Sequence, residues 1–200
     1  MNVTQTIAKY ALQMRQRPYW CGDAPRILLK HDGRCYSTAQ KADFSKITRE
    51  DVVDITGLST PESEVLMASK DCNAMILSNT PYLDICIASR HPIEAVLDDM
   101  AQVIGSKVDV VPYTEKDIKR ALKNAEAVMV AGKYSISCGR NLYEAFVTMC
   151  ILEKSAEIML KSAVLGGAKP ISGGLTRAMR KVYKSKYSRL EMEHKDDFEG

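Results

Sequence analysis

The sequence has few of the residues from which metal sites are usually built. Its three histidines, His31, His91 and His194, lie far apart in the chain, and nothing in their spacing suggests that they converge on one ion. The six cysteines include no C-x-x-C pair. This argues against a structural zinc site and favours buried thiols that serve as small apolar side chains. We therefore expect neither a structural zinc site nor a multi-histidine metal site.

Long apolar runs and a strong net charge are also missing. No apolar stretch approaches the length of about 20 residues that a membrane span requires. The first 20 residues lack the apolar core and the cleavage site of a signal peptide. The net charge of +3 is too small to indicate a nucleic-acid partner without a clustered basic patch. These absences predict a soluble, cytoplasmic protein with no membrane partner and no nucleic-acid partner.

The chain does contain enough apolar residues for one folded domain. Its 200 residues are 46% hydrophobic and 26% charged, as is ordinary for soluble domains. Alternating apolar residues around Asp32 and Gly33 predict a β-hairpin over residues 26–37. Further strands are predicted at residues 51–55, 73–78 and 108–113, and two more within residues 125–139, separated by a break at Gly132.

Helices are predicted between these strands from helical spacing and capping residues. Thr4, Thr80, Thr114 and Asn141 stand at the expected starts, and a proline occupies the first position of two helices. The predicted helices span residues 4–16, part of 60–71, 80–90, 91–105, 114–125 and 141–166. Helices alternating with mixed strands predict an α/β protein, namely a single α/β/α layered domain over residues 1–172. A basic helix and an acidic tail are predicted over residues 173–200.

The strand predicted at residues 73–78 ends in a polar segment. Ser78, Asn79 and Thr80 follow the apolar run and lead through Pro81 into a helix. Folds of the α/β class commonly keep their chemistry at such strand ends. Yet "LSNTP" contains no histidine, cysteine or carboxylate. The segment is either an active site without its reactive groups or an ordinary strand end.

Several segments, taken in order, resemble the class II aldolase/adducin family. "PESE" resembles its P-S-S-E loop, "DCNAMILSNTPY" its D-x-N-A-V-V-H-x-H-S-P-Y strand, "VVPY" its x-x-P-Y strand, and "ALKNAEAVMVAGKYSISCG" a segment that contains N-H-G. The resemblance covers roughly residues 22–172. It implies a mixed, largely antiparallel central sheet. It also implies aldol cleavage or epimerisation of sugar phosphates at a divalent cation, usually zinc, held by three histidines.

The three metal-binding histidines of the family fall on other residues here. The two in H-x-H correspond to Leu77 and Asn79, and the one in N-H-G corresponds to Lys133. Leucine has no donor atom, an amide oxygen is a weak zinc ligand, and a charged ammonium is repelled by a dication. Zinc is expected for the family. At the three corresponding positions, however, the sequence has no suitable ligands, and it therefore predicts no bound metal and no cofactor.

The other site positions of the family are only partly kept. The proton-transfer glutamate corresponds to Glu64. In the phosphate-binding set, Asp23 and Glu62 would place negative charge against a phosphate, which Lys41 could partly offset. The resulting catalytic candidates are Glu64 and Lys133, and the substrate-binding candidates are Asp23, Thr38, Lys41, Ser63, Asn79 and Tyr113.

Two of these features allow more than one interpretation. Lys133 could pair with Glu64 and fill the space of a lost metal, bind an anionic or carbonyl ligand, or form a Schiff base once desolvated. The basic stripe of the tail could bind nucleic acid or an acidic partner, but acidic neighbours favour a solvated helix face. That stripe consists of Arg177, Arg180, Lys181, Lys184, Lys186 and Arg189.

Three functions follow from these observations. The first is a metal-free homologue that binds a ligand or has a structural or regulatory role. The second is an aldehyde-lyase or epimerase acting on a sugar phosphate or related aldol, with a relocated metal or Lys133 in place of the metal. The third, weaker function is nucleic-acid or partner binding through the basic tail. The resemblance also implies a homo-oligomer, a tetramer in many members of the family.

Overall fold

A seven-stranded sheet forms the centre of the molecule. The computed structural model describes residues 2–17 and 25–193. The strand order in the sheet is β3-β2-β1-β4-β9-β8-β7, and every neighbouring pair is antiparallel except β7 and β8. Its strands are β1 (Arg26–His31), β2 (Arg34–Thr38), β3 (Val52–Asp54), β4 (Ala74–Ser78), β7 (Val110–Val111), β8 (Ala127–Val130) and β9 (Ser135–Gly139). The prediction of a mixed, largely antiparallel sheet is confirmed.

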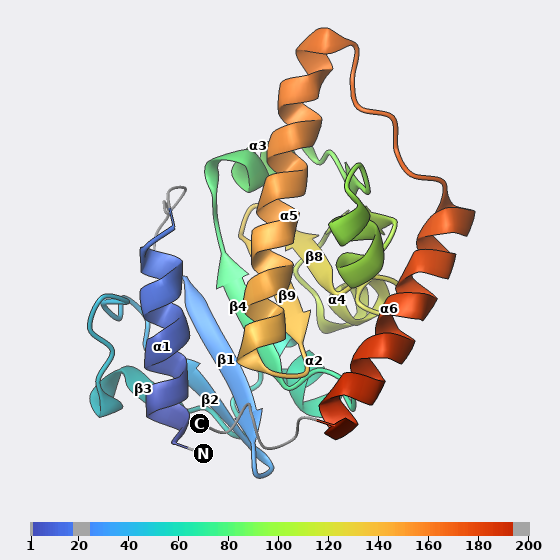
Figure 1. Cartoon of the computed structure of the whole chain (residues 1–200). Coiled ribbons are helices and arrows are strands. Elements are labelled where there is room, and N and C mark those ends of the chain that lie inside the picture. The colour runs from blue at the N-terminus through green and yellow to red at the C-terminus, as the bar shows by residue number, and fades with distance from the viewer. Residues whose placement is uncertain (1, 18–24, 194–200) are drawn as a thin grey trace.

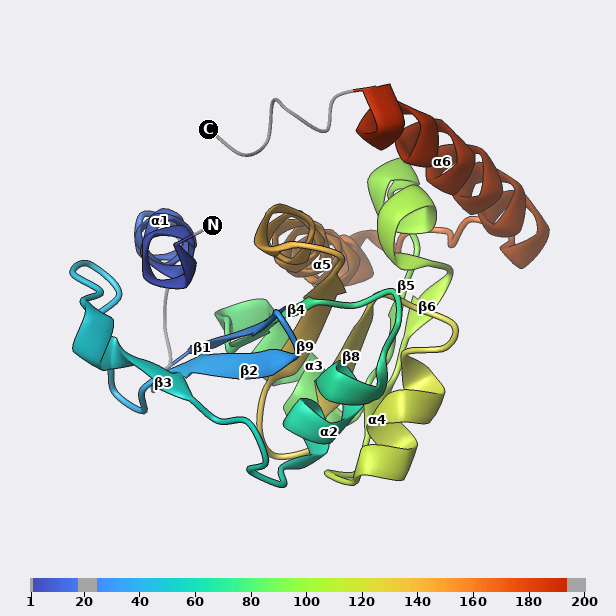
Figure 2. The ribbon, with the colours of Figure 1, turned by 90° about the horizontal axis from the view of Figure 1, so that it is seen from below.

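Helices cover both faces of this sheet (Figures 1 and 2). The helices are α1 (Val3–Arg15), α2 (Pro61–Ala68), α3 (Pro81–Ser89), α4 (Glu115–Ala121), α5 (Leu142–Ser162) and α6 (Gly173–Glu193). Short helical turns lie at η1 (Arg49–Asp51) and η3 (Ala163–Leu165). Figure 2 shows α1 and α5 on one side of the sheet and α2 and α4 on the other. This is the predicted α/β/α layering.

Alternating strand residues build a separate core on each face. Ile27 and Ile76 pack with α1 and α5, whereas Leu28, Met75 and Leu77 pack with α2 and α4. Successive side chains of a strand point to opposite faces, so an apolar strand such as "AMILS" supplies both cores at once. All five residues of β4 are buried, which fixes this strand at the centre of the sheet.

The local signals at turns and caps are mostly confirmed. Asp32 and Gly33 have φ values of 49° and 74°, as the type I′ turn of the predicted hairpin requires. The Thr114 hydroxyl accepts a hydrogen bond from the backbone N–H of Asp117 at 3.1 Å at the start of α4. The first helix differs from the prediction, because Asn2 rather than a threonine caps it.

The helix predicted over residues 91–105 is wrong. The structure has a short strand, β5 (Ile93–Glu94), and later a π-helical turn, η2 (Met100–Ile104). Strand β5 pairs with β6 (Lys107–Val108) in a separate two-stranded sheet, in which Ile93 lies opposite Val108. Main-chain pairing to a distant segment therefore overrides the helical spacing of the apolar residues.

The strand predicted at residues 108–113 is split for the same reason. Its first part belongs to β6 and pairs with β5, and its second part is β7, which pairs in parallel with β8. The apolar run of residues 108–113 predicts a strand but gives no information about its neighbours, because periodicity does not identify the partner of a strand. The sequence therefore could not show that the run pairs in two different sheets.

Helix α6 is held against the domain by its basic residues. The Arg180 guanidinium donates hydrogen bonds to the carbonyls of Val103 and Ile104, and it pairs with the Glu126 carboxylate at 2.7 Å. Lys184 also pairs with Glu126, at 2.9 Å. The predicted C-terminal helix is present, and Arg180 of its basic stripe packs inward, whereas Lys184 reaches Glu126 with more than half of its side chain exposed. The domain boundary at residue 172 stays a prediction.

Candidate functional site

A cavity of about 470 Å³ opens at one end of the central strands. Its lining comes from the start of β1, the ends of β2 and β4, and the turn before β9. The register explains this grouping, because Arg26 lies opposite Leu77, and Ser78 lies opposite Ser135. In antiparallel pairs, the end of one strand meets the start of its neighbour. The lining residues are Arg26, Ser37, Thr38, Ala39, Gln40, Val53, Ile55, Leu77, Asn79, Tyr113, Lys133 and Tyr134.

The three residues that the sequence resemblance aligns with the family's histidines meet in this cavity. Leu77, Asn79 and Lys133 all line it, although Lys133 is 54 residues from Asn79 in the chain. The Asn79 side-chain amide donates one hydrogen bond to the Lys133 carbonyl at 2.7 Å and another to the Asp84 carboxylate at 2.8 Å. The strand end of β4 and the turn before β9 are therefore bound to each other directly.

The donor set of these three residues does not fit the family's zinc. Leu77 offers no lone pair, and the Asn79 amide nitrogen is already engaged as a donor, which leaves one weakly binding oxygen. The Lys133 ammonium has no free lone pair while it is charged. Over residues 2–17 and 25–193, no cluster of three or more histidine, cysteine or carboxylate side chains is placed to hold a metal ion.

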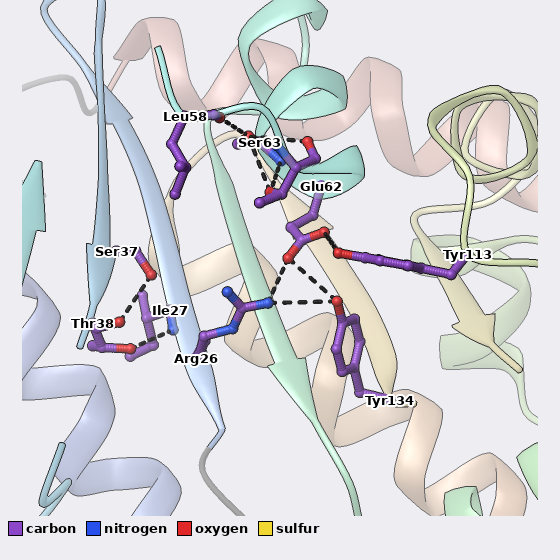
Figure 3. A network of polar contacts seen from close by, with 10 residues as sticks. Arg26, Ile27, Ser37, Thr38, Leu58, Glu62, Ser63, Tyr113 and Tyr134 are labelled. Atoms are coloured by element: carbon purple, nitrogen blue, oxygen red, sulfur yellow. Dashed lines mark hydrogen bonds and ion pairs between the residues drawn. The ribbon is translucent and has the colours of Figure 1, made fainter. Parts of the chain in front are cut away.

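A buried carboxylate network lies beside the cavity (Figure 3). Glu62 points inward from the first turn of α2 and has 0% of its side chain exposed. It pairs with the Arg26 guanidinium and accepts hydrogen bonds from the hydroxyls of Tyr113, at 3.0 Å, and Tyr134, at 3.3 Å. A buried carboxylate is costly unless it is paired and hydrogen-bonded. Here both of its oxygens have partners.

Burial keeps the two phenols of this network protonated. The pKa of Tyr134 is raised above its ordinary value, first by burial and then by the negative charge of Glu62. Burial also raises the pKa of Tyr113, although its hydrogen bond with Tyr134 acts in the opposite direction. Because each phenol retains its proton, it can donate to the carboxylate. The network is therefore stable as a charged Glu62–Arg26 pair with two neutral donors.

Lys133 is placed by aromatic rings. Its Nζ lies 4.1 Å from the centroid of the Tyr113 ring and 6.0 Å from that of Tyr134. An ammonium over an aromatic face is attracted by the electrons of the ring. Among the side chains that the structure describes, Lys133 and Glu64 do not form an ion pair. The predicted repair of the cavity by a Lys133–Glu64 pair therefore has no counterpart in the structure.

The other predicted site residues divide into two groups. Thr38, Asn79, Tyr113 and Lys133 line the cavity, and the Thr38 hydroxyl accepts a hydrogen bond from the backbone N–H of Ile27 at 3.1 Å.

Glu64, Ser63 and Lys41 do not line the cavity. The exposed Glu64 carboxylate accepts a hydrogen bond from Ser59, and the Ser63 hydroxyl donates to the Leu58 carbonyl at 2.7 Å. Lys41 is exposed on a turn with φ of 69°. Asp23 lies outside the described residues. The roles assigned to all these residues stay predictions.

Sequence reasoning missed the structural importance of Glu62, Arg26 and Tyr134. The sequence did contain a signal that Glu62 points inward. Val65 and Leu66 follow it by three and four residues, so the three side chains share one face of α2, and all three are buried. Glu64 lies on the opposite face of that helix. Arg26 carried no comparable signal, since its contact with Glu62 spans 36 residues of sequence.

Comparison with known families agrees with this geometry. Residues 14–160 match the family described as the Class II Aldolase and Adducin N-terminal domain. The chain belongs to this family. A comparison with curated protein sequences finds no match.

Solved structures of class II aldolases have the same fold. An L-fuculose 1-phosphate aldolase has a TM-score of 0.81 at 20% identity, with 92% of this chain and 96% of that chain covered. The L-fuculose-1-phosphate aldolase of Thermus thermophilus has a TM-score of 0.70 at 16% identity, covering 84% and 98%. That of Glaciozyma antarctica has a TM-score of 0.72 at 14% identity, covering 95% and 89%. At these identities the likeness establishes the fold and leaves the activity open.

Proposed function

We propose that this protein is a metal-free member of the class II aldolase family that binds a small molecule and lacks zinc-dependent sugar-phosphate aldolase activity. One observation carries the proposal. Leu77, Asn79 and Lys133, which the sequence resemblance aligns with the three zinc-binding histidines, meet in one cavity. Because none of the three is a good zinc ligand, the cavity keeps the shape of a binding site without the Lewis acid.

The carboxylates near the cavity support the same conclusion. Glu62 already has Arg26, Tyr113 and Tyr134 as partners, so it is not available to move a proton. Glu64, the counterpart of the catalytic glutamate, is exposed and bonded to Ser59. What the cavity offers a ligand is its hydroxyl and amide groups and the Lys133 ammonium.

Assembly and location are part of this proposal. The family resemblance supports a homo-oligomer, and a tetramer is the form we expect. No helix among the described residues is long and apolar enough to cross a membrane. We expect a protein that works in the cytoplasm without a bound cofactor.

A second candidate function is an aldehyde-lyase or epimerase that uses Lys133 or a relocated metal. The observation in its favour is that the Lys133 ammonium lines the cavity and has no carboxylate partner among the described side chains. A lysine amine that has lost its ammonium proton adds to a carbonyl carbon, the resulting carbinolamine loses water, and the imine so formed is reduced by borohydride to a stable amine. Mass spectrometry after borohydride treatment with aldehydes and ketoses would locate such an adduct on Lys133.

Metal analysis together with an aldol-cleavage assay tests the first proposal. The purified chain should contain no stoichiometric zinc, manganese or cobalt, and it should leave L-fuculose 1-phosphate uncleaved when these metals are added. Stoichiometric metal with cleavage of the sugar phosphate would overturn the proposal.

A designed variant tests the placement of the three positions. Combining Leu77→His, Asn79→His and Lys133→His should create a zinc site, measured by competition with a chelator. The matched control carries only Leu77→His and Asn79→His, and it should bind zinc far more weakly because one ligand is missing. Equal affinity of the two variants would show that Lys133 does not lie at the third position.

A further inference from the structure

Within the part of the chain that the structure describes, one cation of the cavity lining has no ion-pair partner. Among the described residues that line the cavity, Arg26 and Lys133 are the two that carry charge. Arg26 is committed to the buried Glu62 carboxylate. Lys133 forms no ion pair with any carboxylate whose side chain the structure describes, and its ammonium rests on the ring of Tyr113. The described lining therefore carries about one uncompensated positive charge.

Several hydrogen-bond donors that line the cavity already donate to protein groups, whereas those of Lys133 do not. The hydroxyls of Tyr113 and Tyr134 donate to Glu62, and the Ser37 hydroxyl donates to the Thr38 carbonyl at 2.9 Å. The three N–H groups of the Lys133 ammonium make no hydrogen bond to any described side chain or backbone group. An ammonium with three unused donors is suited to hold an oxyanion.

The single positive charge of the described lining favours a carboxylate over a phosphate monoester. A carboxylate carries one negative charge, which matches the single free ammonium. A phosphate monoester carries nearly two at neutral pH. Its second charge would have no cation in the described lining, because Arg26 is already paired with Glu62. Electrostatics therefore favour a monoanion at this site.

The rest of the lining suits an uncharged ligand body. Leu77, Val53 and Ile55 contribute apolar surface, and Gln40 and Asn79 contribute amides. A volume of about 470 Å³ is within the range of sites for small metabolites. The body of a small organic acid can thus lie in the cavity while its charged group remains near Lys133.

We propose that this cavity binds a small organic monocarboxylate, whose carboxylate accepts hydrogen bonds from the Lys133 ammonium. The inference rests on the proposed metal-free function, because it makes the Lys133 ammonium, and no metal ion, the positive group that holds the ligand.

Calorimetric titration with matched probes tests the ligand class. The probes are lactate, gluconate and benzoate, each paired with its neutral amide, and glycerol 3-phosphate serves as the phosphate. At least one carboxylate should bind, its amide should bind about tenfold more weakly or not at all, and added salt should weaken carboxylate binding. Absence of binding by all three acids at millimolar concentration, or tighter binding of glycerol 3-phosphate, would overturn the proposal.

Variants at Lys133 test the position. Lys133→Gln should weaken the carboxylate about tenfold, and Lys133→Arg should retain most of the affinity. The control is Lys123→Gln, which removes an exposed lysine outside the cavity lining and should leave binding unchanged. An equal loss of carboxylate affinity in Lys123→Gln and Lys133→Gln would show that binding depends on the overall charge of the protein, and it would refute a local site at Lys133.

The outcome can be separated from that of the proposed function. If the acids fail to bind to a protein that is free of metal and inactive on L-fuculose 1-phosphate, only the carboxylate proposal falls. If metal analysis finds stoichiometric zinc and the sugar phosphate is cleaved, the proposed function falls, and the carboxylate proposal falls with it.

Discussion

Arg26 at the start of β1 pairs with Glu62 at the start of α2, and the carboxylate of this pair is completely buried. The contact joins the central sheet to the helical layer beside the cavity. Since Tyr113 and Tyr134 also donate to Glu62, one carboxylate organises much of the cavity wall (Figure 3).

Removing the cation of this pair should destabilise the fold. Arg26→Met leaves the Glu62 carboxylate buried without its cation, and we expect a loss of about 3 kcal/mol in the free energy of unfolding, measured with urea. The control is Arg34→Met, which breaks an exposed pair with Asp54 and should leave stability close to that of the wild type. Similar stabilities of the two variants would contradict the assigned importance of the buried pair.

Alkaline pH should destabilise the protein through Tyr134. Its folded pKa is raised above the ordinary value of 10.0, so the folded state keeps a proton that the unfolded state loses. The stabilising effect is complete below pH 10.0 and declines as the pH rises from there towards the folded pKa. Tyr134→Phe should make the free energy of unfolding less dependent on pH in this range. The exposed Tyr143→Phe serves as the control, and an identical alkaline slope in Tyr134→Phe and wild type would argue against this assignment.

Gly139 should tolerate no side chain. A Cβ at this position would collide with the backbone nitrogen of Ala145, and it would lie 2.6 Å from the Cβ of Glu144. Gly139→Ala should therefore destabilise the junction of β9 and α5 by about 3 kcal/mol. Thermal unfolding measures the effect. In the control, Gly174→Ala, the added methyl group meets open space on α6 and should be neutral or slightly stabilising.

Arg180 should anchor α6 to the domain. Arg180→Gln removes an ion pair with Glu126 and a hydrogen bond to the Val103 carbonyl. Backbone amides of α6 should then exchange hydrogen faster, since local opening becomes easier. Lys181→Gln, at an exposed neighbouring position, is the control for loss of charge. Unchanged exchange in Arg180→Gln would show that Arg180 does not anchor the helix.

Local signals in the sequence predicted much of the fold. The turn at Asp32 and Gly33, the cap at Thr114 and the apolar run of β4 each act over a few residues, and the structure confirms them. The helix predicted at residues 91–105 failed because Ile93 pairs with Val108. The apolar spacing of residues 91–105 could not reveal that pairing, because periodicity does not identify the partner of a strand.

The sequence by itself determined the family resemblance, and it predicted that Leu77, Asn79 and Lys133 stand in place of the family's three histidines. Residue identity is enough for that conclusion, because ligand chemistry belongs to the side chain. Only the tertiary structure decided which charged groups have partners. It placed Glu62 inward against Arg26 and left the Lys133 ammonium over Tyr113. Such pairings join residues far apart in the chain, and burial and strand register determine them.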